Sequence, residues 1–221
     1  MITDLKTNLS SENITDIIPL GDMPVISVVG AGGKTTIVKR IAFEYGRAAI
    51  STTTHMYKEA EPDVCAEAAL SSQGVVWCGK DDGEKISRPD YLDSIKDIPL
   101  IIEADGSRHM PFKTPGEHEP QIYFRSTAVI GVLGLSALGK TIAQAAHRPE
   151  ETARFLSVGT DHIITEEDFA AVITSNEGLQ KNVRTDFYAI LAQSQTYSLY
   201  KSAEKIAALC GDTKIYAYKI D

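Results

Sequence analysis

The chain has 221 residues, of which 43 % are hydrophobic and 24 % charged, a balance typical of globular proteins. Its 30 Asp and Glu residues exceed its 22 Lys and Arg residues, which gives a formal net charge of -8 at pH 7. This sign argues against a nucleic-acid partner, because proteins that hold a phosphate backbone do so with a surplus of cations.

Three cysteines, Cys65, Cys78 and Cys210, are too few and too far apart for a disulfide framework or a Cys-x-x-Cys metal pair. We expect buried thiols in a reducing compartment. The first residues lack the basic start and apolar core of a signal peptide, and the longest apolar stretch, 128–138, is far below membrane-spanning length. The sequence therefore predicts a cytoplasmic protein without a membrane partner.

Residues 1–46 contain a segment that leads into the sheet, the first predicted strand and the first predicted helix. Residues 1–24 are polar apart from a few isoleucines and Leu20, and they predict a short helical lead-in. The β-branched run 25–29, bounded by glycines, is typical of a buried parallel strand. From Lys34 onward apolar residues recur every three or four positions until Gly46, which predicts an amphipathic helix.

Strands and helices alternate along the rest of the chain. Further strands are predicted at 47–52, 75–78, 98–104, 127–133, 187–192 and 213–217, and helices at 61–70, after Pro149, after Thr165 and at 197–210. This alternation predicts an α/β fold in three layers, with a mostly parallel sheet and helices on both of its faces. No linker divides residues 1–221, so we expect a single domain.

The segment G-A-G-G-K-T-T, residues 30–36, lies between the first strand and the first helix. Backbone N–H groups of such a loop surround a phosphate, while Lys34 would neutralise the β and γ oxygens and the Thr35 hydroxyl would bind Mg²⁺. The common phosphate loop has a glycine where this chain has Val28, so the loop is two residues shorter and resembles the form found in Mur-type ligases. The sequence therefore predicts a P-loop NTPase-like domain that binds ATP or GTP.

Glu103 lies near the end of the apolar run 98–104, and Asp105 directly follows that run. The two carboxylates are two positions apart, so both can point to the same side of the strand. A magnesium site needs a carboxylate at the end of a neighbouring strand, and either residue could supply it. The alternatives are a salt bridge for Glu103 and a turn role before Gly106 for Asp105.

Polar residues also gather after the second strand and after Asp105. Thr53 and His55 could reach the ligand or cap the strand end. In the proline-bounded segment 107–120, Arg108 and Lys113 could hold an anion, and Glu117, His118 and Glu119 could hold a metal or transfer a proton. The segment would form a lid over the ligand, or its charges would simply be solvated. Residues 147–150 read most simply as a helix start.

These residues define three candidate groups. For nucleotide binding we predict Gly30, Ala31, Gly32, Gly33, Lys34, Thr35, Thr36, Thr53 and His55; for catalysis Lys34, Asp105, Arg108 and His118; for Mg²⁺ Thr35, Glu103 and Asp105.

The motifs at 29–36, 52–55, 103–108, 115–120, 132–135, 138–140 and 147–150 resemble those of the YqeC family, in the same order. Of these, Glu-Ala-Asp-Gly-Ser-Arg followed by Glu-His-Glu-Pro is the most specific. The resemblance implies a nucleoside-triphosphate-binding accessory protein that serves maturation of a selenium-dependent molybdenum hydroxylase, with that enzyme or its cofactor as partner. Where a purine-reading Asn or Asp is expected, the chain has 193–196 without a carboxylate, which leaves ATP and GTP both open.

Three functions are compatible with these residues. The first is an NTP-hydrolysing maturation protein. The second is a Mur-like kinase or ligase that activates a small anion, although the chain is too short for the further domains of those ligases. The third is a nucleotide-gated binding protein without rapid turnover.

Overall fold

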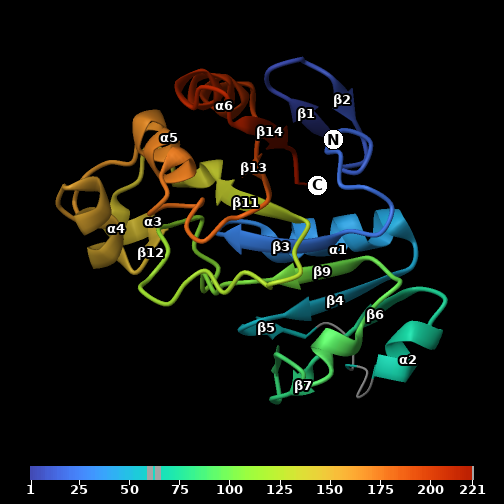
Figure 1. The fold of residues 1–221 in the computed structure, drawn as a ribbon. Helices are drawn as coiled ribbons and strands as arrows, with labels where there is room; N and C mark the ends of the chain where they lie inside the picture. Colours follow the sequence, from blue (N-terminus) through green and yellow to red (C-terminus); the bar gives the residue numbers. More distant parts are fainter. Residues whose placement is uncertain (59–61, 63–65, 221) are drawn as a thin grey trace.

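The computed structural model describes residues 1–58, 62 and 66–220, and a nine-stranded sheet lies at its centre (Figure 1). The strand order is β2-β1-β14-β13-β11-β3-β9-β4-β6, and all neighbours from β14 to β6 run parallel. These parallel strands are β3 (Val25–Gly30), β4 (Ala48–Thr52), β6 (Val75–Trp77), β9 (Leu100–Glu103), β11 (Ala128–Gly134), β13 (Asp186–Ala192) and β14 (Lys214–Tyr218). Each was predicted from its apolar run, and the α/β class with a mostly parallel sheet is confirmed.

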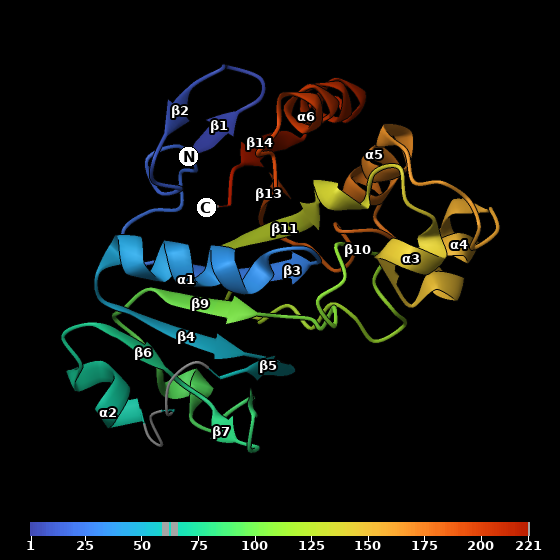
Figure 2. The same cartoon turned by 180° about the vertical axis from the view of Figure 1, so that it is seen from behind.

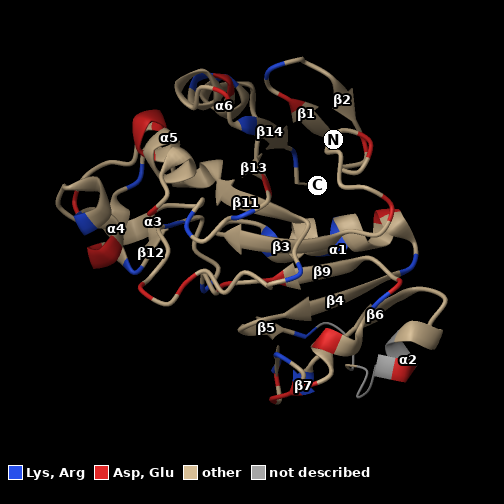
Figure 3. Cartoon of the chain, viewed as in Figure 1, with Lys and Arg blue, Asp and Glu red and all other residues tan. Residues whose placement is uncertain are grey.

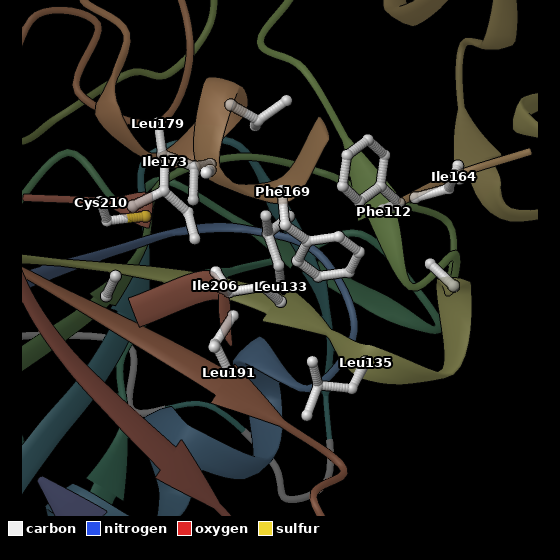
Figure 4. Packing of buried hydrophobic residues seen from close by; sticks show 14 of the residues in the cluster. Phe112, Leu133, Leu135, Ile164, Phe169, Ile173, Leu179, Leu191, Ile206 and Cys210 are labelled. Carbon is white, nitrogen blue, oxygen red and sulfur yellow. The ribbon is translucent and has the colours of Figure 1, made fainter. Parts of the chain in front are cut away.

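Apolar residues on alternating parities of the strands build a core on each face of this sheet. On one face α1 (Lys34–Tyr45) packs Ile37 and Ile41 against Val28, and Figure 2 shows this helix in front of the strands. On the other face α5 (Glu166–Thr174) and α6 (Tyr197–Leu209) cover the sheet, and Phe169 lies near Leu133 in the close view of Figure 4. Helices therefore cover both faces.

Smaller elements surround the sheet. A three-stranded antiparallel sheet is formed by β5 (His55–Tyr57), β7 (Lys80–Asp81) and β8 (Lys85–Ser87), and β10 (Phe112–Lys113) pairs in parallel with β12 (Ala146–His147). The remaining elements are α2 (Ala66–Ser71), α3 (Ile142–Ala145), α4 (Pro149–Leu156) and the 3-10 turns η1 (Leu92–Ser94) and η2 (Leu135–Ala137). Pro149 occupies the first turn of α4, as predicted.

The predicted helical lead-in at residues 1–24 is wrong. The segment contains β1 (Ile2–Asp4) and β2 (Ser10–Ser11), and β1 extends the sheet by pairing antiparallel with β14, with Ile2 opposite Tyr218. The isoleucines of this segment lie in turns and not in a helix: the N–H groups of Ile17 and Ile18 both donate to the carbonyl of Ile14. Pairing with a strand over 200 positions away thus decides the structure of this segment.

Two other expectations concern residues near the gap. Of the predicted helix 61–70, Pro62 is not helical and α2 begins at Ala66, while residues 61 and 63–65, which include Cys65, lie outside the described residues. Cys78 and Cys210 are buried free thiols, as expected. Within the described ranges, none of the helices has both the length and the apolar character needed to cross a bilayer.

Candidate functional site

Three loops that carry predicted site residues meet at the carboxyl edge of the sheet. They meet because β9 lies between β3 and β4, and Glu103 pairs with Val28 on one side and Thr52 on the other. A cavity of about 850 Å³ opens there. It is lined by Gly32, Gly33, Lys34, Thr35, Thr36, Thr54, His55, Met56, Tyr57, Lys85, Glu103, Gly106, Ser107, Arg108, His109, Glu119, His147, Arg148, Pro149 and Gln193.

The glycine loop, residues 30–36, passes close over β11 and needs its glycines for that path. Gly32 has a φ of +77°, and a Cβ there would lie 2.6 Å from the Cα of Gly134. The N–H of Ala31 donates to the carbonyl of Val132 at 2.8 Å. Helix α1 then begins at Lys34, and no side chain caps it at Gly33. The N–H groups of its first turn are therefore available to an anion in the cavity.

Lys34 is 3 % exposed, and its ammonium lies among oxygen atoms of the predicted site. Its Nζ donates to the Gly30 carbonyl at 2.8 Å and to the Ser107 hydroxyl at 3.1 Å. The same Nζ lies 3.3 Å from Asp105 Oδ1 and 3.8 Å from Glu103 Oε1. The hydroxyl of Thr35 donates to Glu103 Oε2 at 2.8 Å. The structure thus brings together the lysine, the hydroxyl and both carboxylates that the sequence singled out.

The two carboxylates lie in different positions. Glu103 lines the cavity, and burial raises its pKa while Lys34 and Thr35 act against this shift. Asp105 is 1 % exposed and is absent from the cavity wall; its Oδ2 accepts from the Gly30 N–H at 2.9 Å. Asp105 therefore fixes the start of the glycine loop, whereas Glu103 faces the cavity.

A second set of charges continues from Asp105 into the segment 107–120. The buried Nζ of Lys113 lies 3.0 Å from Asp105 Oδ2 and donates to Glu119 Oε2 at 2.7 Å. Glu119 in turn accepts two hydrogen bonds from the guanidinium of Arg148, at 2.8 and 3.1 Å. Lys34, Asp105, Lys113, Glu119 and Arg148 therefore form one row of alternating charges, which we call the ion row. Burial favours a higher pKa for Glu119, but Lys113 and Arg148 together lower it to about 2.

Some predicted residues lie outside the cavity wall. His118 is exposed and does not line the cavity, and Thr53 donates its hydroxyl to the Gln121 carbonyl at 2.7 Å, which is a strand-end role. Gly30 and Ala31 do not line the cavity; their N–H groups donate to Asp105 and to the Val132 carbonyl and so hold the loop in place. His55 lines the cavity, with 64 % of its side chain exposed and its Nε2 3.8 Å from Asp82 Oδ2.

The predicted lid at 107–120 is wrong for the middle of that segment. Phe112, Lys113 and Thr114 are buried, and β10 is held by parallel pairing with β12. Lys113 cannot meet an arriving anion, because its ammonium is already paired with two carboxylates. The exposed part is the turn that carries Arg108 and His109.

The sequence interpretation did not place His147 and Arg148 in the site: it read residues 147–150 as a helix start and as one of the family motifs. Pairing of Lys113 with His147 in the β10–β12 ladder brings His147 and the following Arg148 to the cavity. Burial and then the positive charges of Lys113, Arg148 and Arg108 lower the pKa of His147 to about 4, with Glu119 acting in the opposite direction. The stacked rings of Tyr57 and His109, with centroids 5.2 Å apart, were missed as well. No local signal could have found these groupings, because they depend on long-range pairing.

The fold and the site together define an α/β protein with a glycine loop at the carboxyl edge of a mostly parallel sheet. The sequence model of the YqeC protein matches residues 26–150. The chain is also 35 % identical over 182 residues to the Uncharacterized protein YqeC of Escherichia coli (strain K12), a match covering 72 % of this chain and 71 % of that protein. The chain therefore belongs to the YqeC family, as its motifs predicted. No solved structure gives a significant match.

Proposed function

We propose that the chain is a P-loop NTPase-like domain over residues 1–221 that binds ATP or GTP with Mg²⁺ at residues 30–36. One observation carries the proposal: the uncapped start of α1, the ammonium of Lys34 and the Thr35–Glu103 pair all face one cavity. Backbone N–H groups, a lysine and a hydroxyl beside a carboxylate are the groups that phosphate binding with magnesium requires.

In this proposal the triphosphate lies against the N–H groups of residues 32–36, and the Lys34 ammonium pairs with the phosphate oxygens in place of Asp105. Asp105 keeps its bonds to the Gly30 N–H and Lys113, so the carboxylate that Lys34 leaves is still neutralised. The Thr35 hydroxyl and Glu103 would hold Mg²⁺, which supplies charge neutralisation between the β and γ phosphates. Within the described residues no group of three His, Cys, Asp or Glu side chains could hold a metal. The ion would therefore share its ligands between protein, water and phosphate, which is how Mg²⁺ is commonly bound.

The family resemblance extends the proposal to the biological role. We propose that nucleotide turnover serves maturation of a selenium-dependent molybdenum hydroxylase in the cytoplasm, with that enzyme or its cofactor as partner. Turnover of ATP and GTP by the purified protein, measured with and without the hydroxylase, tests this role. An unchanged rate in the presence of the hydroxylase would count against the partnership.

Nucleotide binding itself is tested with Lys34→Ala. Calorimetry with Mg²⁺ and either nucleotide should show at least about a tenfold loss of affinity, because a charge-assisted phosphate contact contributes about 1.5–3 kcal/mol. The matched control is Lys140→Ala, since Lys140 is exposed and lies outside the cavity wall. Unchanged affinity in a folded Lys34→Ala protein would show that the loop is not the phosphate site.

A second candidate function is phosphorylation of a small anionic substrate, in the manner of Mur-type ligases. The observation that favours it is a group of side chains in the same cavity that suit an anion and come from segments outside the glycine loop: the guanidinium groups of Arg108 and Arg148 and the imidazole of His147.

A further inference from the structure

The cavity wall carries an excess of cationic groups. It contains the ammonium or guanidinium groups of Lys34, Lys85, Arg108 and Arg148, whereas its carboxylates are Glu103 and Glu119. Acidic residues are spread over the chain, whose net charge is -8 (Figure 3). A local surplus of the opposite sign attracts anions into the cavity.

Strained backbone is concentrated at the same wall. Positive φ occurs at eight non-glycine residues of the described chain, and four of them line the cavity: Arg108 (47°), His109 (62°), Arg148 (58°) and Gln193 (68°). A left-handed conformation of this kind is strained in a residue other than glycine, and such residues cluster at ligand sites. The surrounding structure therefore holds Arg108 and Arg148 in positions that an unstrained backbone would not give them.

The two guanidinium groups differ in what they contact. Arg148 is oriented by its two hydrogen bonds to Glu119, at the end of the ion row. Arg108 has no hydrogen-bond or ion-pair partner among the residues that the structure describes, and its side chain lines the cavity. His147 lies beside them, and burial, followed by the positive charges of Lys113, Arg148 and Arg108, lowers its pKa to about 4. Guanidinium and imidazole N–H groups that face the same cavity are suitable donors to an oxyanion.

We propose that Arg108, His147 and Arg148 form a second subsite, separate from the glycine loop, that binds the carboxylate or phosphate group of a small-molecule substrate while the nucleotide is bound. The subsite deepens the proposed function and rests on it, because it places a second substrate in the cavity of the triphosphate. A volume of about 850 Å³ is near the upper end of the roughly 300–1,000 Å³ of small-molecule sites, which leaves room for both ligands.

The experiment uses the full chain loaded with Mg²⁺ and a non-hydrolysable analogue of ATP or GTP. Inorganic phosphate and malonate are titrated separately in a calorimeter, so that the two arms distinguish a phosphate substrate from a carboxylate substrate. Wild type should bind one of them at a single further site. The variants Arg108→Gln and His147→Gln should each weaken that binding about tenfold, the loss expected for one charge-assisted hydrogen bond, and leave the affinity for the nucleotide analogue unchanged.

The control is Arg154→Gln, which removes the same charge from an exposed position of α4 outside the cavity wall and should change neither affinity. The subsite is wrong if wild type binds neither probe, or if Arg108→Gln and His147→Gln bind it as wild type does. It is also wrong if both variants lose nucleotide affinity to the same extent, since these residues would then belong to the triphosphate site. If instead Lys34→Ala keeps full nucleotide affinity, the proposed function fails. The phosphate titration of the nucleotide-free variants then tests the subsite on its own.

Discussion

Lys113 and Asp105 form a buried ion pair in which Nζ lies 3.0 Å from Oδ2, and their side chains are 0 % and 1 % exposed. Asp105 also accepts the N–H of Gly30, so the pair connects the glycine loop to the segment that carries Glu119. Removing one partner from a buried pair leaves an uncompensated charge, which is more costly than the pair itself is stabilising.

Lys113→Met should therefore lower the free energy of unfolding by about 3–5 kcal/mol, the cost of breaking a buried ion pair from one side. Urea denaturation at pH 7 measures the change. Lys140→Met, at an exposed lysine, should change it by less than about 0.5 kcal/mol. A loss below about 1 kcal/mol in Lys113→Met would mean that Asp105 and Glu119 are solvated rather than paired.

Gly32 and Gly139 offer a matched test of the glycine loop. Their φ angles are +77° and +75°, but a Cβ on Gly32 would lie 2.6 Å from Gly134 Cα and 2.8 Å from the Pro111 carbonyl oxygen, whereas Gly139 has nothing within 4 Å. Gly139→Ala should cost only the left-handed backbone, about 1–2 kcal/mol. Gly32→Ala should cost more and abolish nucleotide binding in calorimetry. Equal stability losses in the two variants would show that Gly32 has space for a side chain.

Substitution of Glu103 and of Asp105 should change the magnesium dependence of nucleotide binding to different extents. Glu103 lines the cavity and accepts the Thr35 hydroxyl, so Glu103→Gln should weaken nucleotide binding in Mg²⁺ much more than in EDTA. Asp105→Asn should keep the ratio of the two affinities near that of wild type and lower the unfolding free energy, because it weakens the bonds to Gly30 and Lys113. The reverse pattern would assign the metal to Asp105.

The sheet could be predicted from sequence because each parallel strand is a short, mostly buried run rich in apolar residues, a pattern that can be recognised locally. The run 25–30 is buried at every position, and so are 48–52 and 128–134. The amino-terminal strand could not be predicted in this way: Ile2 and Thr3 become a strand only by pairing with Tyr218 and Ala217, at the other end of the chain.

The same physical limit applies to the site. Lys34, Thr35 and the two carboxylates follow from a loop motif and from strand ends, both of which are local. The placement of Arg148 depends on two contacts with the distant segment 107–120, the β10–β12 pairing and the bonds to Glu119. For His118 the sequence offered a reactive residue type in a polar loop, but residue type does not determine which way an exposed side chain points.

Glu119 makes the stability of the protein depend on pH in acid. Its pKa is lowered to about 2 in the folded chain, from an ordinary value of 4.5, by Lys113 and Arg148 acting against burial. Because the unfolded chain binds the proton more tightly, the contribution of Glu119 is fully present above pH 4.5 and is lost as the pH falls toward 2. One pKa unit corresponds to about 1.4 kcal/mol, so between pH 6 and pH 3 this loss should reach about 2 kcal/mol.

The test compares the pH dependence of unfolding in wild type and Glu119→Gln by urea denaturation at pH 6, 4 and 3. The variant should be less stable at pH 6, because Lys113 and Arg148 lose a charged partner, but its stability should fall less steeply toward pH 3 by about 2 kcal/mol. Using the difference between the two curves removes the shared contributions of other groups. Among these is Glu103, whose raised pKa acts in the opposite direction. Parallel curves would mean that Glu119 titrates normally in the folded protein and that the ion row ends at Lys113.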